Sequence, residues 1–312
     1  MKPHVLFVTE KWTDADPKKQ ITNNQHNLFG SLEMTGLATY ECVHYDEYYV
    51  SFGKKIDEYL IKKVSQTKPD LVVVCPLPWY PHCPSQDTYR KINSISKVVF
   101  IWADAAYFMP LAKQLEDCST LSVLWDMDTD WKPNTKFLHL WTPQDPRLYY
   151  ADETEKDIDV CFLGNPDYPE RRKYLEFLEK EKVKVYIAGG RNKNYVSFTE
   201  YANLLRRSKI SLNFSLSSTG IAQLKGRIHE TMFCNAMLME SHNDKNWIDR
   251  WFVNGIHYVS FANTIELKEK IEYYLKNDKE RKMISLNGNR LASENYSNTS
   301  WWKTVFYESN IT

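Results

Sequence analysis

The stretch IDVCFLG (residues 158–164) decides how this chain is organised, because it repeats a pattern that the N-terminus has already set. Like HVLFV at residues 4–8, it is a largely apolar run, as expected of a strand that is buried on both faces of a parallel sheet. Between them lies TPQDPRLYYADETEKD (142–157), which is acidic, broken by proline and typical of an interdomain linker. The sequence therefore predicts two domains, each starting with a buried strand.

Strands and helices alternate through both halves of the chain. In the first half, the run LVVVC (71–75) follows a helical pattern at 56–68, and KVVFIWAD (97–104) follows another at 88–96. The second half repeats this order after residue 158. Such alternation is typical of a doubly wound parallel sheet, which binds ligands at the carboxyl ends of its strands. The predicted fold class is therefore α/β, with two Rossmann-like domains.

Charge and composition narrow the partners. The 40 Lys and Arg balance the 40 Asp and Glu, so we do not expect a nucleic-acid partner. No segment approaches the ~20 apolar residues that cross a bilayer, and the apolar run in MKPHVLFVTE is too short for a signal peptide. None of the six cysteines forms a C-x-x-C pair, which favours reduced thiols. These features predict a cytoplasmic protein without a transmembrane segment.

The stretch QLKGRIHETMFCNAMLME (223–240) is the strongest candidate for a binding site. Lys225 and Arg227 lie at the start of a predicted helix, whose free N–H groups favour an anion. Glu230, one turn further, could accept hydrogen bonds from two vicinal hydroxyls. Together they suit a nucleoside diphosphate. An equally good alternative is that the cations are solvated and that Glu230 pairs with one of them, and spacing alone does not separate the two.

The residues around this stretch resemble a known family. KGRIHETMFCNAMLMES, with IDVCFLGNPDYPERRKYLEFL before it and VSFANTIELKEKIEYYLKNDKERKMISLNGNRLASENYS after it, is similar to the C-terminal half of GT-B glycosyltransferases. The likeness is greatest to the CgeB-like branch of the family 4-type enzymes. It covers roughly residues 158–305. The N-terminal half is similar mainly through KPDLVVV and FIWAD.

The resemblance implies an arrangement of domains. Two Rossmann-like domains would face each other across a cleft, with residues 1–150 binding the acceptor and residues 151–293 binding a nucleotide-sugar. A last helix within residues 294–312 would cross back onto the first domain.

The resemblance also implies roles for single residues. Glu230 would hold the ribose of the donor, and Lys225 and Arg227 would lie near its diphosphate. Related enzymes often carry a second glutamate eight residues earlier, where this chain has Ala222, which leaves the transferred sugar open. Two further pairs complete the implied donor site: Gly164 and Asn165 near the phosphate, and Gly190 and Arg191 near the nucleobase.

Candidates for proton transfer come from the N-terminal half. His82 follows LVVVC after a short loop, and Asp104 ends KVVFIWAD. Either could act as a base on an acceptor hydroxyl if the reaction inverts configuration. A retaining reaction needs no protein base, and both residues also fit structural roles, with His82 capping a turn and Asp104 capping a helix. Glu10 also follows a strand, the first of the chain.

LWDMDTDW (124–131) places Asp126, Asp128 and Asp130 in alternation. A D-x-D motif binds a metal in another glycosyltransferase fold, but the GT-B likeness implies lysine and arginine at the phosphates. We therefore expect an acidic turn or rim here and neither a metal nor another cofactor.

These observations predict a glycosyltransferase that moves a sugar from a nucleotide-sugar to the hydroxyl of a glycan or another acceptor in an interdomain cleft. Two alternatives remain open from the sequence. A GT-B-type nucleotide-sugar epimerase would turn over without an acceptor, and a non-catalytic nucleotide- or glycan-binding protein on a decayed transferase scaffold would bind without turnover.

Overall fold

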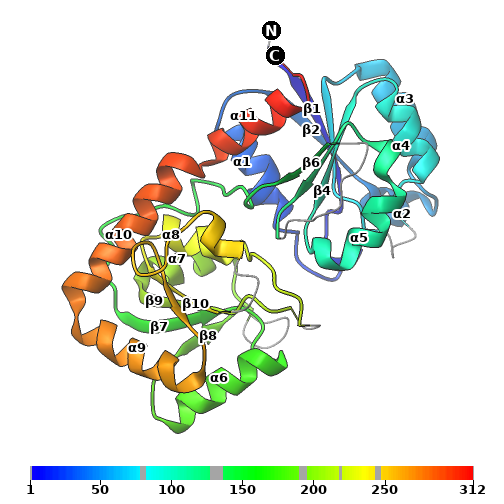
Figure 1. Ribbon diagram of the computed structural model, residues 1–312. Coiled ribbons are helices and arrows are strands. Elements are labelled where there is room, and N and C mark those ends of the chain that lie inside the picture. Colours follow the sequence, from blue (N-terminus) through cyan, green and yellow to red (C-terminus); the bar gives the residue numbers. More distant parts are fainter. Residues whose placement is uncertain are drawn as a thin grey trace. The chain divides into compact units, whose positions relative to one another are not determined.

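The computed structural model describes residues 2–77, 82–126, 136–189, 195–217, 220–242 and 247–311. The chain divides into two compact units, and each is built around one parallel sheet (Figure 1). Unit 1 is Met1–Asp145 together with Asn298–Thr312, and unit 2 is Pro146–Ser297. The predicted α/β class with two Rossmann-like domains is confirmed.

Unit 1 contains a six-stranded sheet in the order β2-β1-β3-β4-β5-β6, in which every neighbouring pair is parallel. The first strand of the chain, which lies between β2 and β3, is so apolar that residues 5–8 are fully buried, as the sequence pattern predicted. The strands are β1 (His4–Thr9), β2 (Thr39–His44), β3 (Leu71–Val74), β4 (Lys97–Trp102), β5 (Leu121–Leu124) and β6 (Lys136–His139).

Helices cover both faces of this sheet. Figure 1 shows α1 and α11 on one face and α3 and α4 on the other. The last helix is fastened to α1 by Trp302, whose Nε1 donates to Ser31 Oγ at 3.0 Å. The helical segments are η1 (Thr13–Ala15), η2 (Gln25–Gly30), α1 (Ser31–Glu33), α2 (Tyr45–Phe52), α3 (Asp57–Thr67), α4 (Gln86–Asn93), α5 (Ala105–Gln114), η3 (Glu116–Cys118) and α11 (Asn298–Glu308).

Unit 2 contains a five-stranded parallel sheet in the order β11-β10-β9-β7-β8. Buried side chains that alternate along β7 pack against α6 and α9 on one face and against α7 on the other. Its elements are β7 (Ile158–Leu163), α6 (Pro169–Lys180), β8 (Tyr186–Ala188), α7 (Phe198–Arg207), β9 (Ser208–Asn213), α8 (Arg227–Phe233), β10 (Met237–Ser241), η4 (Trp247–Arg250), β11 (Val259–Phe261), α9 (Thr264–Lys276) and α10 (Asp278–Asn295).

The two sheets share one topology. In each, the first strand lies between the second and the third, so the chain leaves the first strand towards one side and later returns on the other. Doubly wound sheets bind ligands at such a switch point, outside the carboxyl ends of the strands. The switch point of unit 1 lies between β1 and β3, and that of unit 2 lies between β7 and β9.

The sequence pattern did not predict one strand, β2, and one helix, α2. β2 is the edge strand of its sheet, and most of its side chains are only partly buried, so it carries no continuous apolar run. The helix α2 follows it directly and holds two fully buried polar side chains, Tyr45 and Asp46. Among the described residues, no helix is long and apolar enough to span a membrane.

Candidate functional site

Gly164, the residue that follows β7, lies directly against Arg227 at the switch point of unit 2. A Cβ built on Gly164 would overlap with Nη2 of Arg227. The backbone N–H of Gly164 donates to the carbonyl of Ala188 at 2.7 Å, which fixes this turn beside β8. Gly189 lies close by with a φ of +84°, which favours glycine. The glycine predicted at the end of β7 is therefore needed for the close approach of the guanidinium.

Arg227 is held by its other neighbours as well. Its Nη1 donates to Asn213 Oδ1 at 2.6 Å, and its guanidinium lies 5.2 Å from the centre of the Phe162 ring. Its Nε is buried and has no hydrogen-bond partner among the described residues. A fixed cation with an unused donor is suited to binding an anion. Because α8 begins at Arg227 and has only seven residues, the positive charge comes mainly from the side chain.

Arg171, on the first turn of α6, is a second cation near Arg227, and it is buried whereas Arg227 is partly exposed. It was not among the residues expected from the sequence. Its Nη1 donates to the carbonyl of Asn165 at 3.0 Å, and only 5% of the residue is exposed. Burial and the charge of Arg227 lower the pKa of Arg171 to about 10. Two like charges held in a buried site are unfavourable without an anion between or beside them. Arg171 and Arg227 are called the arginine pair below.

The sequence around Arg171, PERRKYL, is rich in charge and predicts a solvated helix. The neighbouring Arg172 is indeed exposed, with more than half of its side chain accessible. Only the phase of the helix distinguishes the two arginines, and that phase is visible in the apolar positions Tyr174, Leu175 and Leu178, which are buried on the same face as Arg171.

Glu230 lies one turn after Arg227 on α8. Its Oε2 accepts a hydrogen bond from the hydroxyl of Tyr201 at 2.9 Å. Burial raises the pKa of Glu230, whereas the Tyr201 hydroxyl and the charge of Arg227 lower it. Arg227 is hydrogen-bonded to Asn213 rather than paired with this carboxylate. The alternative in which Glu230 simply neutralises Arg227 therefore does not describe the structure.

The other predicted donor-site residues are placed unequally. Lys225 lies in the loop before α8 and donates from Nζ to Gln223 Oε1. Asn165 lies after Gly164, and its side-chain Oδ1 accepts from the backbone N–H of Asp167 at 3.0 Å. Gly190 and Arg191 lie outside the described residues, so their predicted contact with a nucleobase stays a prediction.

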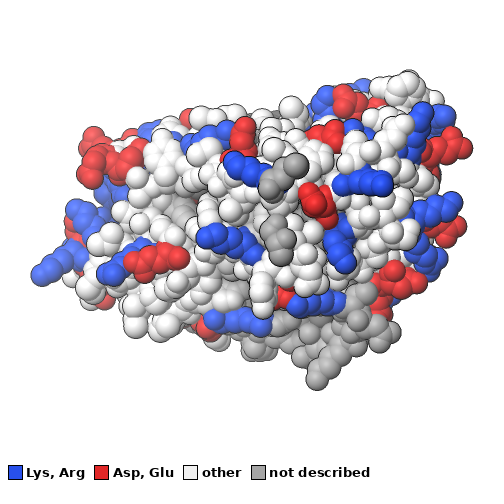
Figure 2. Space-filling model, turned by 90° about the horizontal axis from the view of Figure 1, so that it is seen from above, with Lys and Arg blue, Asp and Glu red and all other residues white. Residues whose placement is uncertain are grey.

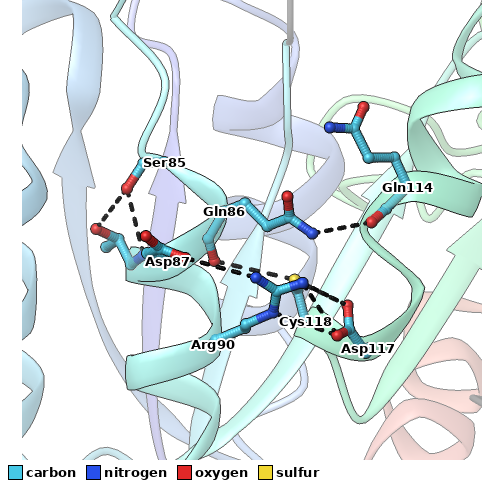
Figure 3. A network of polar contacts seen from close by, with 8 residues as sticks. Ser85, Gln86, Asp87, Arg90, Gln114, Asp117 and Cys118 are labelled. Carbon is cyan, nitrogen blue, oxygen red and sulfur yellow. Dashed lines mark hydrogen bonds and ion pairs between the residues drawn. The ribbon is translucent and has the colours of Figure 1, made fainter.

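His82 and Asp104, the two predicted bases, both belong to unit 1. The ring of His82 packs edge-on against Tyr49, with the ring centres 4.3 Å apart. Three residues later the chain is fixed by Ser85, whose N–H donates to Asp57 Oδ1 at 2.7 Å and whose hydroxyl caps α4. Figure 3 shows Ser85 at the start of α4 and, further along this helix, Arg90, whose Nη2 lies 3.1 Å from Oδ2 of Asp117.

Asp104 occupies the N-cap position of α5 but makes no capping hydrogen bond with its side chain. It is exposed and has a φ of 56°. Asp126 provides the cap instead, since its Oδ1 accepts from the N–H of Ala105 at 2.8 Å. The structural role suggested for Asp104 as a helix cap is thus wrong for its side chain and falls to Asp126.

Only the first of the three aspartates in the acidic motif, Asp126, lies within the described residues. Asp126 is buried in its capping role, whereas Asp128 and Asp130 lie outside the described residues. In the part of the chain that the structure describes, no group of three or more His, Cys, Asp or Glu is placed to hold a metal ion.

Glu10 is the most perturbed carboxyl group at the switch point of unit 1. Its Oε1 accepts from Asn24 Nδ2 at 3.1 Å and its Oε2 from the Tyr45 hydroxyl at 3.0 Å. Burial, with a smaller contribution from the charge of Asp46, raises the pKa of Glu10 to about 7. A pKa near the working pH suits a group that accepts and returns protons.

The position of Glu10 is fixed by its surroundings. The hydroxyl of Tyr45 also lies 3.1 Å from the carbonyl of Cys75, so it connects the end of β1 to the end of β3. The buried carboxylate of Asp46 accepts from the backbone N–H groups of Lys11 and Trp12, at 2.8 and 3.0 Å. The sequence had already pointed to Glu10 by its place directly after the first buried strand, but not to Asn24, Tyr45 and Asp46 around it.

Comparisons with known proteins agree with this architecture. A family model described as "Glycosyl transferase-like" matches residues 170–306, which include the arginine pair and Glu230. No curated protein matches the chain in sequence.

Solved structures match over almost the whole chain. Anabaena HepE in complex with UDP and glucose is 12% identical, with a TM-score of 0.62, and the match covers 98% of this chain and 100% of that one. The DNA-modifying enzyme β-glucosyltransferase is 12% identical, with a TM-score of 0.60, and the match covers 99% of this chain and 100% of that one. Sucrose-phosphate synthase from Thermosynechococcus elongatus is 8% identical, with a TM-score of 0.62, and the match covers 99% of each chain. The protein therefore has the GT-B fold, in which each unit is Rossmann-like.

Proposed function

We propose that this protein is a glycosyltransferase that uses a nucleoside-diphosphate sugar as donor. The observation that carries the proposal is the guanidinium of Arg227, held against Gly164 and hydrogen-bonded to Asn213 near the buried Arg171. When the bond between the sugar and the diphosphate breaks, negative charge develops on the leaving group, and fixed cations stabilise it. The family model, which spans Arg171, Asn213 and Arg227, and the UDP complexes of fold relatives support the same donor class.

Finer assignments follow from the resemblance to the CgeB-like branch. Glu230 would accept hydrogen bonds from the ribose hydroxyls, and Lys225 and Arg227 would contact the diphosphate. Gly190 and Arg191 would lie near the nucleobase. The acceptor would be a glycan or another hydroxyl-bearing molecule bound by unit 1, with His82 or Asp104 as its base if the reaction inverts configuration.

We further infer that the reaction needs no metal and that the protein works in the cytoplasm. The arginine pair supports the first inference, because its charges take the place that a divalent cation would occupy at the diphosphate. The free thiols of all six cysteines suit a reducing compartment. The formal net charge of zero gives no sign of a nucleic-acid acceptor. Both signs of charge occur on the face drawn in Figure 2.

The donor assignment is tested by calorimetric titration with UDP, ADP, GDP and dTDP. We expect one of these nucleotides to bind, and we expect Arg227→Ala and Glu230→Ala to weaken that binding at least about tenfold, the loss of one charge-assisted hydrogen bond. Arg172→Ala, which removes an exposed arginine of α6, is the matched control and should bind as the wild type does. A wild-type protein that is folded and binds none of the four nucleotides would overturn the proposal.

Turnover separates the transferase from its alternatives. The sugar derivative of the nucleotide that binds is incubated with mixed glycan acceptors, and release of the free nucleotide is followed with and without EDTA. Release that depends on an acceptor and persists in EDTA is the expected result. A rearranged nucleotide-sugar formed without acceptor would indicate an epimerase, and tight binding with neither product would indicate a non-catalytic protein.

A further inference from the structure

Behind Arg227 lies a buried chain of polar groups that the proposed function does not use. Asn213 ends β9, and Glu240 lies beside it on β10, the two being partners in the parallel register of the sheet. Asn213 Nδ2 donates to Glu240 Oε2 at 2.5 Å, while Asn213 Oδ1 accepts from Arg227 Nη1 at 2.6 Å. Neither Asn213 nor Glu240 is more than 1% exposed. The chain therefore runs from the sheet interior to the cation at the switch point.

The orientation of the Asn213 amide is fixed by its two partners. A guanidinium can only donate, so the oxygen of the amide must face Arg227. The amide nitrogen then faces Glu240, whose Oε2 accepts. Asn213 thus joins the arginine to the carboxyl group without allowing direct contact between opposite charges.

Glu240 is poorly prepared to carry a negative charge. Its Oε1 is buried and has no hydrogen-bond partner among the described residues. An ionised carboxylate with one unsatisfied oxygen in the protein interior is costly, and such a group keeps its proton instead. The carboxyl group is faced by Asn213 and Ser215 from β9 and its loop, by Arg227 from α8, and by Glu170 and Arg171 from α6. Burial, with a smaller contribution from the charge of Glu170, outweighs the effects of Asn213, Arg227 and Ser215 and raises the pKa of Glu240 to about 8.

We propose that Asn213 and Glu240 are positioning residues that hold Arg227 for the donor diphosphate and tie donor binding to protonation of the Glu240 carboxyl group. This inference rests on the proposed function of the arginine pair. While Glu240 is neutral, it adds no negative charge behind Arg227, and the guanidinium attracts the diphosphate. When Glu240 loses its proton, its negative charge lies one amide away from Arg227 and competes with the diphosphate for the same cation.

The direction of the coupling follows from linkage. A bound diphosphate disfavours a nearby carboxylate, so binding raises the pKa of Glu240 further and takes up a proton. If that increase is about one unit, the affinity falls roughly fivefold between pH 7 and pH 9, and about 0.4 proton is taken up per nucleotide at pH 8. The phosphate groups of the nucleotide are ionised throughout this range. The raised acidity of Arg171, with a pKa of about 10, is the reason to stop the titration at pH 9.

The test uses the full chain and the nucleoside diphosphate that binds most tightly among UDP, ADP, GDP and dTDP. Titrations at pH 7, 8 and 9, each in two buffers of different ionisation enthalpy, give the affinity and the number of protons taken up. The wild type should lose affinity roughly fivefold from pH 7 to pH 9 and take up protons at pH 8. Glu240→Gln, which mimics the neutral carboxyl group, should bind equally well at all three values with no proton uptake.

Two further variants separate positioning from general damage to the fold. Glu179→Gln changes an exposed glutamate of α6 and should keep the wild-type pH profile. Asn213→Ala should weaken nucleotide binding about tenfold at pH 7, since Arg227 loses its hydrogen-bond acceptor. If Asn213→Ala does not fold, the comparison of the wild type with Glu240→Gln still tests the inference.

The outcomes distinguish this inference from the proposed function. If the wild type binds a nucleotide but shows the same pH profile and proton uptake as Glu240→Gln, the inference is wrong and the donor site stands. If the folded wild type binds none of the four nucleotides, the proposed function and the inference fall together.

Discussion

The two units of this protein have the same order in their first five strands but opposite chemistry at their switch points. In unit 2, the residue after the first strand is Gly164, and its missing side chain makes room for Arg227. In unit 1, the corresponding residue after the first strand is Glu10, a carboxyl group held by Asn24 and Tyr45. The topology therefore determines where ligands bind, while one residue at the end of the first strand decides the charge of the group that meets them.

The largest expected effect compares the two buried carboxyl groups. Glu10 and Glu240 have pKa values raised to about 7 and about 8, whereas an unfolded glutamate titrates near 4.5. Between those values the unfolded chain binds fewer protons, so stability falls as the pH rises. The free energy of unfolding should therefore decrease between pH 5 and pH 8. Glu10→Gln should make this decrease smaller by up to about 3 kcal/mol, and Glu240→Gln by somewhat more. Urea unfolding followed by tryptophan fluorescence at both pH values measures this. Equal stability losses in the wild type and both variants would contradict it.

The second effect concerns the glycine of unit 2. Gly164→Ala should destabilise the protein by about 1–3 kcal/mol, because its Cβ overlaps with the Arg227 guanidinium. The loss should shrink when Arg227 is also changed to alanine, since the overlapping atoms are then gone. A double-mutant cycle by urea unfolding gives the coupling energy. A cost of Gly164→Ala that is unchanged in the Arg227→Ala background would place the strain elsewhere.

The third prediction sharpens the charge comparison. Arg171→Ala should weaken nucleoside diphosphate binding about 10- to 100-fold, since one cation of the arginine pair is removed. Lys11→Ala, which removes a cation paired with Glu47 at the switch point of unit 1, should leave that affinity unchanged. Isothermal titration calorimetry of both variants decides. Similar losses of nucleotide affinity in the two variants would contradict the prediction that the nucleotide binds to unit 2 and not to unit 1.

The smallest expected effect uses a matched pair of tyrosines. Tyr201 in unit 2 and Tyr45 in unit 1 each donate a hydrogen bond to the glutamate of their switch point, at 2.9 and 3.0 Å. Each change to phenylalanine should cost about 0.5–1.5 kcal/mol of stability. Only Tyr201→Phe should also reduce nucleotide affinity, because Glu230 loses its orienting partner. The comparison breaks if Tyr45→Phe reduces that affinity as much.

Local pattern predicted most of the scaffold. Buried parallel strands such as β1 and β7 are continuous apolar runs, and helices such as α9 carry apolar side chains at helical spacing, so both are visible without tertiary information. β2 was missed because an edge strand needs burial on fewer sides and tolerates polar residues. Arg227 and Glu230 were singled out because they lie at a predicted helix start, which is also a local feature, whereas Gly164 came only from the family resemblance; the binding roles of all three stay predictions.

The sequence by itself determined the class of this protein: two α/β units that each begin with a buried strand, and a donor-site candidate around Arg227. The tertiary structure alone decided which polar residues are buried together. Arg171 and Arg172 are adjacent and chemically identical, yet only Arg171 is buried, close enough to Arg227 for the charge of Arg227 to lower its pKa. Glu240 and Asn213 are 27 residues apart and meet only because β9 and β10 pair in parallel register. Burial and proximity set the charge state of such groups, and both arise from strand pairing and helix phase between distant segments.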